Sequence, residues 1–329
     1  MDQRPRTTVQ LHPTRRCNLA CRHCYSLSGP DVADETPWPL LAELLEDARA
    51  QGYSRVSLSG GEPLLYPRLA ELLDRAGGLG FARTLTTNGM PLDARRLALL
   101  AGRIELIAIS LDGTPESHNR MRAHPRAFDT MAARLPALRT SGIPFGFIFT
   151  LTQHNLDEAL WVAQFALEQG ALLLQIHPLE EVGRAATELA GSRPDDQEAA
   201  FAFLLTERLK LATAGQLAIQ LDFAHRRHLS ERPEAVYADL PARPRADVPL
   251  AALVRQLVVE TDGTVVPVQH GFPRAFAVGR LQDGRLPVLA AAWKRTRYAA
   301  FRRHCRALAR GLASGPPVFN WNERAAQVA

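Results

Sequence analysis

Short apolar runs alternate with longer amphipathic stretches through the first 190 residues of the chain. Each run has the length of one buried strand, and each stretch places its apolar residues on one face of a helix, as Leu40, Leu41, Leu44 and Leu45 do. Six strand–helix pairs predict an α/β fold, a partial (β/α)6 TIM-like barrel with parallel strands and right-handed crossovers. The predicted strands are residues 8–12, 56–59, 82–87, 106–111, 145–151 and 172–176.

After residue 190 the regular alternation stops. Two β-rich runs, residues 253–260 and 264–267, flank a Gly-containing turn and predict a β-hairpin. The polar, proline-bearing stretch 225–249 is predicted to be a loop or lid. We therefore expect two domains, a barrel core at residues 1–190 and a smaller α+β extension at residues 191–329.

The chain lacks the apolar segments that direct a protein to a membrane or out of the cell. No stretch of its 329 residues reaches the roughly 18 consecutive apolar positions that a membrane helix needs. The first residues, Met1 to Arg6, have no apolar core of the kind found in a signal peptide. The sequence predicts no membrane association and a cytoplasmic location.

The formal charge of +5 raises the question of a nucleic-acid partner. Only Lys210 and Lys294 are lysines, and the arginines are scattered along the chain. The densest basic segment, residues 294–310, has a spacing that suits a solvated amphipathic helix equally well. The charge pattern therefore does not favour nucleic-acid binding.

The four cysteines are distributed unevenly, because Cys17, Cys21 and Cys24 fall within eight residues and Cys305 lies far away. A C-x3-C-x2-C group is too crowded for a disulfide framework, and metal ligation explains it better. Three thiolates can hold a [4Fe–4S] cluster and leave one iron free, whereas a structural zinc site needs a fourth ligand. His12, His23 or Cys305 could supply that ligand, so zinc remains the alternative.

With these cysteines the chain resembles the radical S-adenosylmethionine (SAM) enzymes, which carry a C-x3-C-x2-C loop just after the first barrel strand. The resemblance implies that Cys17, Cys21 and Cys24 hold one [4Fe–4S] cluster, whose free iron chelates the amino and carboxylate groups of SAM. In that family an electron splits the sulfonium of SAM and gives a 5′-deoxyadenosyl radical. A reductant such as flavodoxin or ferredoxin is then an implied partner.

A second motif supports the resemblance at the end of the second predicted strand. Ser59, Gly60, Gly61 and Glu62 form a Gly-Gly-Glu turn, where paired glycines allow a ligand to approach the backbone closely. In radical SAM enzymes a motif of this kind binds the amino group of SAM. The resemblance carries that role to these four residues.

Polar residues also end the third and fourth predicted strands. Thr87 and Asn88 precede Gly89, and Ser110 and Asp112 flank the end of the next strand. Asn-Gly and Asp-Gly are also ordinary turn formers, but their recurrence at carboxyl ends of strands favours a ligand site, because barrel active sites gather there. By resemblance, Thr87 and Asn88 lie near SAM, and Ser110 and Asp112 lie near its ribose.

Two further residues take expected roles from the family pattern. His23, just before the third cysteine, occupies the family's usual aromatic position and is expected beside adenine. His118-Asn119-Arg120-Met121-Arg122 resembles a His-Asp-x-x-Arg segment with Asn119 in place of the acid, so Arg122 is a candidate partner for the SAM carboxylate. A surface arginine at the start of a helix is the alternative for Arg122.

The hairpin region resembles the SPASM-type extension of radical SAM enzymes without its cysteines. Val268 stands where that pattern places one, and Cys305 is the only thiol in this half. One thiol cannot hold an auxiliary cluster, so we predict a single cluster per chain and an extension that covers the substrate. Cys305 is expected to be an inert helix residue, with hydrogen-atom donation to a substrate radical as the alternative.

The leading functional hypothesis is a radical SAM enzyme in which the adenosyl radical abstracts hydrogen from a substrate C–H bond. Maturation of a ribosomally synthesised peptide is the first substrate hypothesis, with docking at the barrel or through a separate peptide-recognition protein. A small-molecule biosynthetic intermediate is the second. A hypothesis of another class is a non-catalytic partner that binds a cluster or zinc during assembly, which the intact cysteine triad and Gly-Gly-Glu turn argue against.

Overall fold

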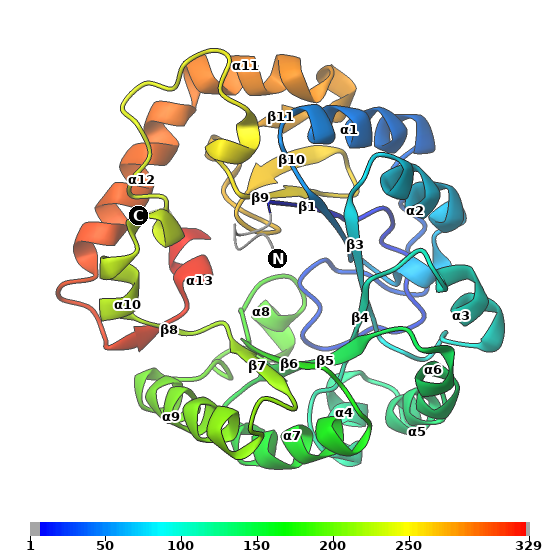
Figure 1. The fold of residues 1–329 in the computed structure, drawn as a ribbon. Helices are drawn as coiled ribbons and strands as arrows, with labels where there is room; N and C mark the ends of the chain where they lie inside the picture. The colour runs from blue at the N-terminus through cyan, green and yellow to red at the C-terminus, as the bar shows by residue number, and fades with distance from the viewer. Residues whose placement is uncertain (1–6, 327–329) are drawn as a thin grey trace.

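The computed structural model describes residues 7–326, and all six predicted strands are present in it. They form neighbouring parallel strands in chain order, with helices packed outside them (Figure 1). The strands are β1 (Thr8–Leu11), β2 (Arg55–Leu58), β3 (Ala82–Thr87), β4 (Leu106–Ser110), β5 (Phe145–Leu151) and β6 (Leu173–Pro178). The helices between them are α1 (Trp38–Ala50), α2 (Leu69–Gly78), α3 (Ala94–Leu100), α4 (Pro115–Met121), α5 (Ala127–Ala132), α6 (Leu135–Ser141) and α7 (Ala159–Glu168).

Alternation along each strand separates an apolar outer layer from a more polar inner one. In β1, Val9 and Leu11 are fully buried, while Thr8 and Gln10 on the opposite face are half-buried. Leu41, Leu44 and Leu45 of α1 are buried in the same apolar core as Val9 and Leu11. Each leucine that is fully buried in this way contributes about 1.5–3 kcal/mol.

Two short helices, α5 and α6, follow one another between β4 and β5. Pro136 lies in the first turn of α6, where its missing N–H costs no intrahelical hydrogen bond. α3 begins at Ala94, because the Asp93 side chain caps it by accepting a hydrogen bond from the Arg96 N–H at 2.8 Å.

The second half of the chain extends the same sheet at both ends. β7 (Ala218–Leu221) adds a seventh parallel strand next to β6, after α8 (Ala185–Glu188) and α9 (Asp196–Ala212). The predicted hairpin forms as β9 (Gln256–Val259) and β10 (Thr264–Pro267), and β9 pairs in parallel with β1, with Val9 opposite Leu257. β11 (Gly279–Arg280) pairs with β10 and completes the ten-stranded sheet. The predicted division at residue 190 stays a prediction, with one sheet crossing it.

The first half of the stretch 225–249 is more ordered than expected from its polar composition, whereas residues 237–249 have no helix or strand. It contains α10 (Arg226–Glu231) and the 3-10 turn η3 (Pro233–Val236), and β8 (Ala224–His225) pairs with β12 (Val318–Phe319). Leu229 and Val236 are buried, so a few apolar anchors order a segment that is otherwise polar. α11 (Leu286–Thr296), α12 (Tyr298–Gly311) and α13 (Trp321–Ala326) follow, and Figure 1 shows α10, α12 and α13 on the side of the molecule between β7 and β11.

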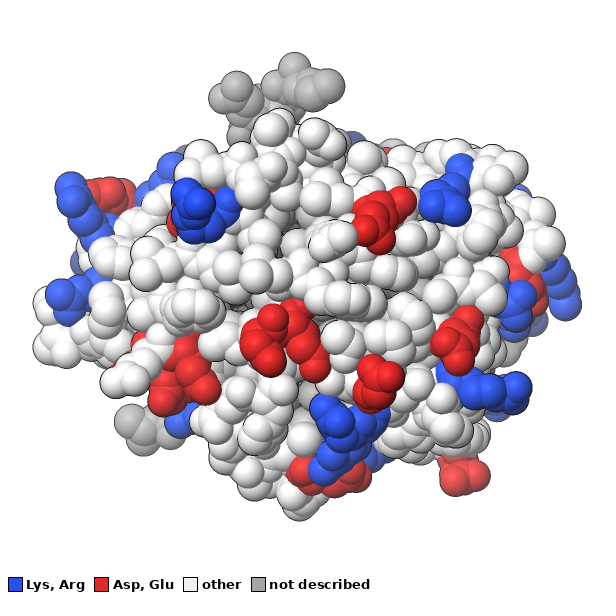
Figure 2. All heavy atoms as spheres, turned by 90° about the horizontal axis from the view of Figure 1, so that it is seen from below, with Lys and Arg blue, Asp and Glu red and all other residues white. Residues whose placement is uncertain are grey.

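Two surface properties bear on possible partners. No helix among residues 7–326 combines the length and apolar character needed to cross a bilayer. On the face shown in Figure 2, basic and acidic side chains are interspersed, so the described part of the chain forms no continuous basic patch there.

Candidate active site

The three clustered cysteines lie in the loop that joins β1 to α1, and all three are free thiols. Cys17 and Cys21 are buried, whereas Cys24 is partly exposed. The Cys24 N–H donates to the Cys21 carbonyl at 3.2 Å, which forms a tight turn within the loop. Burial raises the pKa of Cys17 to about 12 and also raises that of Cys21, where Arg122 opposes it. Such thiols become thiolates when a cationic group compensates the charge, as a metal centre does.

A distant segment holds this loop in place, and sequence reasoning did not assign it that role. The Arg184 guanidinium donates to the carbonyls of Cys21 (2.6 Å) and Ser28 (2.9 Å), and the Arg184 N–H donates to the Cys24 carbonyl at 2.9 Å. The preceding Gly183 has φ +61°, and a Cβ there would lie 2.4 Å from the Tyr25 carbonyl oxygen. Gly183 and Arg184 therefore fix the backbone that carries Cys21 and Cys24.

The Gly-Gly-Glu turn packs directly against the first part of the same loop. A Cβ on Gly61 would lie 2.3 Å from the Arg16 carbonyl oxygen, and Gly60 has φ +108°. The Gly61 N–H donates to the Thr14 carbonyl at 2.8 Å. The glycines thus allow the end of β2 to approach the loop closely, a role that is independent of any ligand.

Glu62 has a different environment from the one its expected role implies. Its side chain is fully buried, and its oxygens accept hydrogen bonds from Thr87 Oγ1 (2.9 Å), the Asn88 N–H (2.9 Å) and the Leu64 N–H (3.1 Å). Burial raises the pKa of Glu62 to about 7, although the three hydrogen-bond donors act in the opposite direction and lower it. Glu62 therefore joins the ends of β2 and β3. Asn88, in turn, donates to Asn18 Oδ1 at 2.8 Å and so reaches the cysteine loop.

Asp112 and Arg122 form a buried ion pair beside the cysteine loop. Arg122 Nε lies 2.6 Å from Asp112 Oδ2, and Asp112 is fully buried. Arg122 also reaches Cys21 Sγ at 3.8 Å, and His23 Nε2 lies 3.9 Å from the same Asp112 oxygen. Burial opposes ionisation of Asp112, but the Arg122 guanidinium outweighs it and holds the pKa of Asp112 below its usual range. Three predicted SAM residues therefore converge around Cys21.

Two other predicted residues lie at the edges of this group. Ser59 Oγ is 3.1 Å from Tyr25 Oη, which links the end of β2 to the residue after Cys24. Ser110 is buried at the end of β4, in register with Ile148 of β5. Together with the preceding contacts, the structure brings all the predicted site residues to the carboxyl ends of β1 to β4.

A cavity of about 240 Å³ opens beside Asp112 and contains residues that sequence reasoning missed. Asn155 lines the cavity, and its amide donates hydrogen bonds to the carbonyls of Asp112 (3.2 Å) and Thr150 (2.9 Å). Thr152 and His154, which follow β5, also line it. These residues form no recognisable motif, but their position just after a barrel strand is a signal that could have found them.

His177 and Asp222, at the ends of β6 and β7, form a second polar pair. His177 Nδ1 lies 2.8 Å from Asp222 Oδ2, and Gln175 also donates to that oxygen at 2.6 Å. Burial lowers the pKa of His177, but the carboxylate of Asp222 outweighs it and raises that pKa overall. His177 is therefore a hydrogen-bonded histidine that shares Asp222 with Gln175.

Comparison with known proteins gives this site its family. Residues 11–166 match the Radical SAM superfamily, a range that runs from β1 to α7. A PqqA peptide cyclase from Ruegeria pomeroyi is 30% identical over 257 residues, 77% of this chain and 65% of that protein. An AdoMet-dependent heme synthase from Methanosarcina barkeri is 31% identical over 174 residues, 52% of this chain and 50% of that protein. Residues 11–166 of the chain therefore match a radical SAM domain.

Solved radical SAM structures show the same fold. SuiB from Streptococcus suis, bound to S-adenosylmethionine, aligns with a TM-score of 0.68 over 90% of this chain and 68% of SuiB, at 16% sequence identity. This chain spans about half the length of the heme synthase and two thirds of the cyclase. The predicted partial barrel is thus confirmed.

The donor set fits the cluster and the SAM that radical SAM proteins use. Among the described residues, no three His, Cys, Asp or Glu side chains are arranged to hold a single metal ion, so the zinc alternative gains no geometric support. A cubane cluster binds each thiolate at a different corner, so its ligands need not converge on one atom. The buried His23 Nδ1 has no hydrogen-bond partner, which suits the predicted position of a polar ligand beside it.

Cys305 lies outside this site. It is fully buried on α12 within the main apolar core, and burial raises its pKa to about 12. This environment suits an inert cysteine, because an apolar site disfavours the reactive thiolate.

Proposed function

We propose that the protein is a radical SAM enzyme with one [4Fe–4S] cluster, held by Cys17, Cys21 and Cys24. The observation that carries the proposal is the convergence of Asp112 and Arg122 on His23 and Cys21 of the cysteine loop. When bound, the cluster and SAM supply a 5′-deoxyadenosyl radical that abstracts hydrogen from a substrate C–H bond. The chain's own contribution is binding, orientation and exclusion of water.

Each part of the site has a distinct task in this proposal. Arg184, Gly60 and Gly61 hold the cysteine loop in place, so that the three thiols are presented together. Cys17 and Cys21 are 8% and 7% exposed, which limits the access of water to a reactive centre. Arg122 offers a guanidinium to the SAM carboxylate, while Asp112 and His23 bind the ribose and adenine.

A peptide is the substrate that we propose first. The similarity to a PqqA peptide cyclase extends over 77% of the chain, beyond the residues that match the superfamily. SuiB, which shares the fold, has also been solved with its precursor peptide SuiA. The second candidate is a small biosynthetic intermediate, favoured by the 31% identity to a heme synthase. The reductant and a separate peptide-recognition protein are further parts of the proposal.

Formation of 5′-deoxyadenosine tests the radical chemistry. Anaerobically reconstituted protein is incubated with SAM and dithionite, and Cys21→Ala is compared with Cys305→Ala. We expect product from the wild type and from Cys305→Ala, and neither iron nor product from Cys21→Ala. Loss of iron in Cys305→Ala would contradict the ligand assignment.

The substrate class is tested by adding candidate peptides and porphyrin intermediates separately to active protein. A peptide that raises 5′-deoxyadenosine formation and loses hydrogen, seen as a mass change, supports the first candidate. Stimulation by a small molecule alone supports the second. A cluster-loaded protein that binds SAM but never cleaves it with any candidate would indicate a non-catalytic assembly partner.

A further inference from the structure

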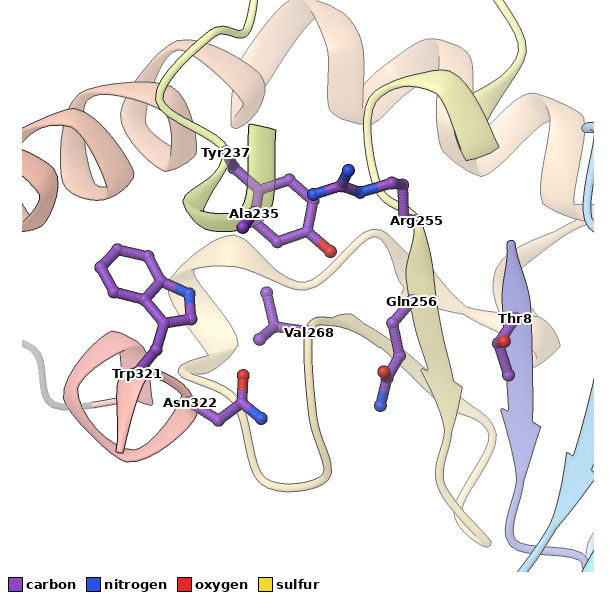
Figure 3. A pocket seen from close by; sticks show the side chains of 8 residues that line it. All are labelled: Thr8, Ala235, Tyr237, Arg255, Gln256, Val268, Trp321 and Asn322. Atoms are coloured by element: carbon purple, nitrogen blue, oxygen red, sulfur yellow. The ribbon is translucent and has the colours of Figure 1, made fainter. Parts of the chain in front are cut away.

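A second cavity of about 240 Å³ lies away from the cysteine loop, at the opposite end of β1. Figure 3 shows Thr8 and Gln256, at the amino ends of β1 and β9, on one side of it and Trp321 and Asn322 of α13 on the other. Arg255, with three further residues, completes the lining: Ala235, Tyr237 and Val268. The four residues of β1 separate this cavity from the cysteine loop by roughly 13 Å, at about 3.3 Å per residue.

The cavity contains hydrogen-bond donors that the protein leaves unused. Trp321 is only 7% exposed, and its indole N–H is buried without a hydrogen-bond partner. In Figure 3 the nitrogen of that ring faces the interior of the cavity. A buried donor of this kind destabilises the folded protein unless something accepts its hydrogen bond. The structure therefore has a place for an acceptor between α13 and β9.

Arg255 adds a positive charge at the same place. Its guanidinium stacks 5.4 Å from the centre of the Tyr237 ring and donates to the Glu234 carbonyl. No carboxylate among the described residues forms an ion pair with it, and no acidic side chain lines the cavity. The stacking fixes the plane of the guanidinium, and this planar group suits a planar anion.

Two residues that line the cavity have strained backbone conformations. Tyr237 has φ +56° and Val268 has φ +70°, and a β-branched residue rarely adopts this left-handed conformation. Both side chains line the cavity. Strain of this kind persists where a structure holds side chains at a functional position.

We propose that this cavity binds a small ligand through a carboxylate group. The carboxylate accepts hydrogen bonds from the Arg255 guanidinium and the Trp321 indole N–H, and the amides of Gln256 and Asn322 lie within the same cavity. A phosphate is less suitable, because one arginine and neutral donors leave most of a dianion uncompensated. The carboxylate can belong to a free organic acid or to the end of a peptide.

Nuclear magnetic resonance of the tryptophan indole groups tests this site in the reconstituted protein. The chain has four tryptophans, and Trp321→Phe assigns the relevant signal. Titration with benzoate is expected to shift the Trp321 indole N–H saturably, whereas the neutral isostere benzamide leaves it unchanged. Arg255→Leu is expected to weaken benzoate binding at least 10-fold, and Arg243→Leu, at an exposed arginine outside the cavity, is the matched control.

The probes distinguish the sources of the carboxylate. Tighter binding of a short peptide with a free carboxyl terminus than of benzoate assigns the site to peptide ends, and the reverse order assigns it to small acids. The proposal is overturned if benzamide or an amidated peptide binds equally well, if Arg255→Leu binds benzoate like the wild type, if only inorganic phosphate binds, or if nothing binds saturably. The comparison of benzoate with benzamide on the wild type needs no variant and so does not depend on variant folding.

Discussion

Arg122→Leu isolates the energetics of the buried Asp112–Arg122 pair. The substitution keeps an apolar side chain but leaves a carboxylate that is fully buried, with its cation removed from 2.6 Å. His23, 3.9 Å away, does not compensate, because burial lowers its pKa to about 4 and it is neutral at pH 7. Removing one partner of a buried ion pair costs about 3–5 kcal/mol, and we expect Arg122→Leu to lower the free energy of unfolding by that amount.

The assay is equilibrium urea unfolding of the protein without SAM, followed by circular dichroism. With an m-value of about 3 kcal/mol/M, the expected midpoint shift at pH 7 is about 1 M or more. The control is Arg126→Leu, at an exposed arginine close to Arg122 in the chain. This variant should change the free energy of unfolding by no more than about 0.5 kcal/mol. The double variant Asp112→Asn, Arg122→Leu should recover part of the loss, because it removes the unpaired charge.

The pH dependence gives this prediction its sign. In the wild type the folded pKa of Asp112 is depressed, so its stabilising contribution is present above the unfolded pKa of 3.8 and is lost below it. In Arg122→Leu the same carboxyl has a raised pKa and is relieved by protonation as the pH falls. The difference between the two proteins should therefore shrink from pH 7 to pH 4. A loss below about 1 kcal/mol, or one independent of pH, would refute the reasoning.

Two further predictions concern the groups that support the cysteine loop. Gly183→Ala places a Cβ 2.4 Å from the Tyr25 carbonyl oxygen, so reconstitution should yield less than about half the wild-type iron content. The control is Gly215→Ala, at φ +79° with open space around it. This variant should bind iron normally and lose only about 1 kcal/mol in its free energy of unfolding. Equal iron in both variants would contradict the proposed role of Gly183. Burial raises the folded pKa of Glu62 from 4.5 to about 7, so the wild type should lose stability relative to Glu62→Gln as the pH rises through that range, measured by urea unfolding at pH 5 and pH 8. A constant difference would show that Glu62 is ionised throughout.

Much of the barrel follows from local patterns in the sequence. Apolar runs with amphipathic stretches between them predict β1 to β6, because a strand buried on both faces and a helix with one apolar face have different periods. The cysteine spacing predicts the metal-binding loop, and polar residues after β2, β3 and β4 predict where its neighbours lie. Parallel strands bring their carboxyl ends to one edge, so this part of the site needs no long-range information.

Other features depend on contacts between segments far apart in the chain. β9 pairs with β1 across more than two hundred residues, and Arg184 holds the carbonyl of Cys21 from a distance of 163 positions. Residues 226–236 form helical turns because Leu229 and Val236 enter the core, although their polar surroundings predict a loop. No local pattern encodes such pairings, because each partner alone resembles an ordinary strand, arginine or loop residue.

The sequence by itself determined the elements of this protein and the residue types gathered at its site, since periodicity and spacing are properties of the chain. Only the tertiary structure decided how those residues are used. Glu62 accepts hydrogen bonds from Thr87 and Asn88, and Arg122 pairs with Asp112, because burial requires each charged group to find a partner within reach. Which partner lies within reach is a consequence of how the strands are placed in space.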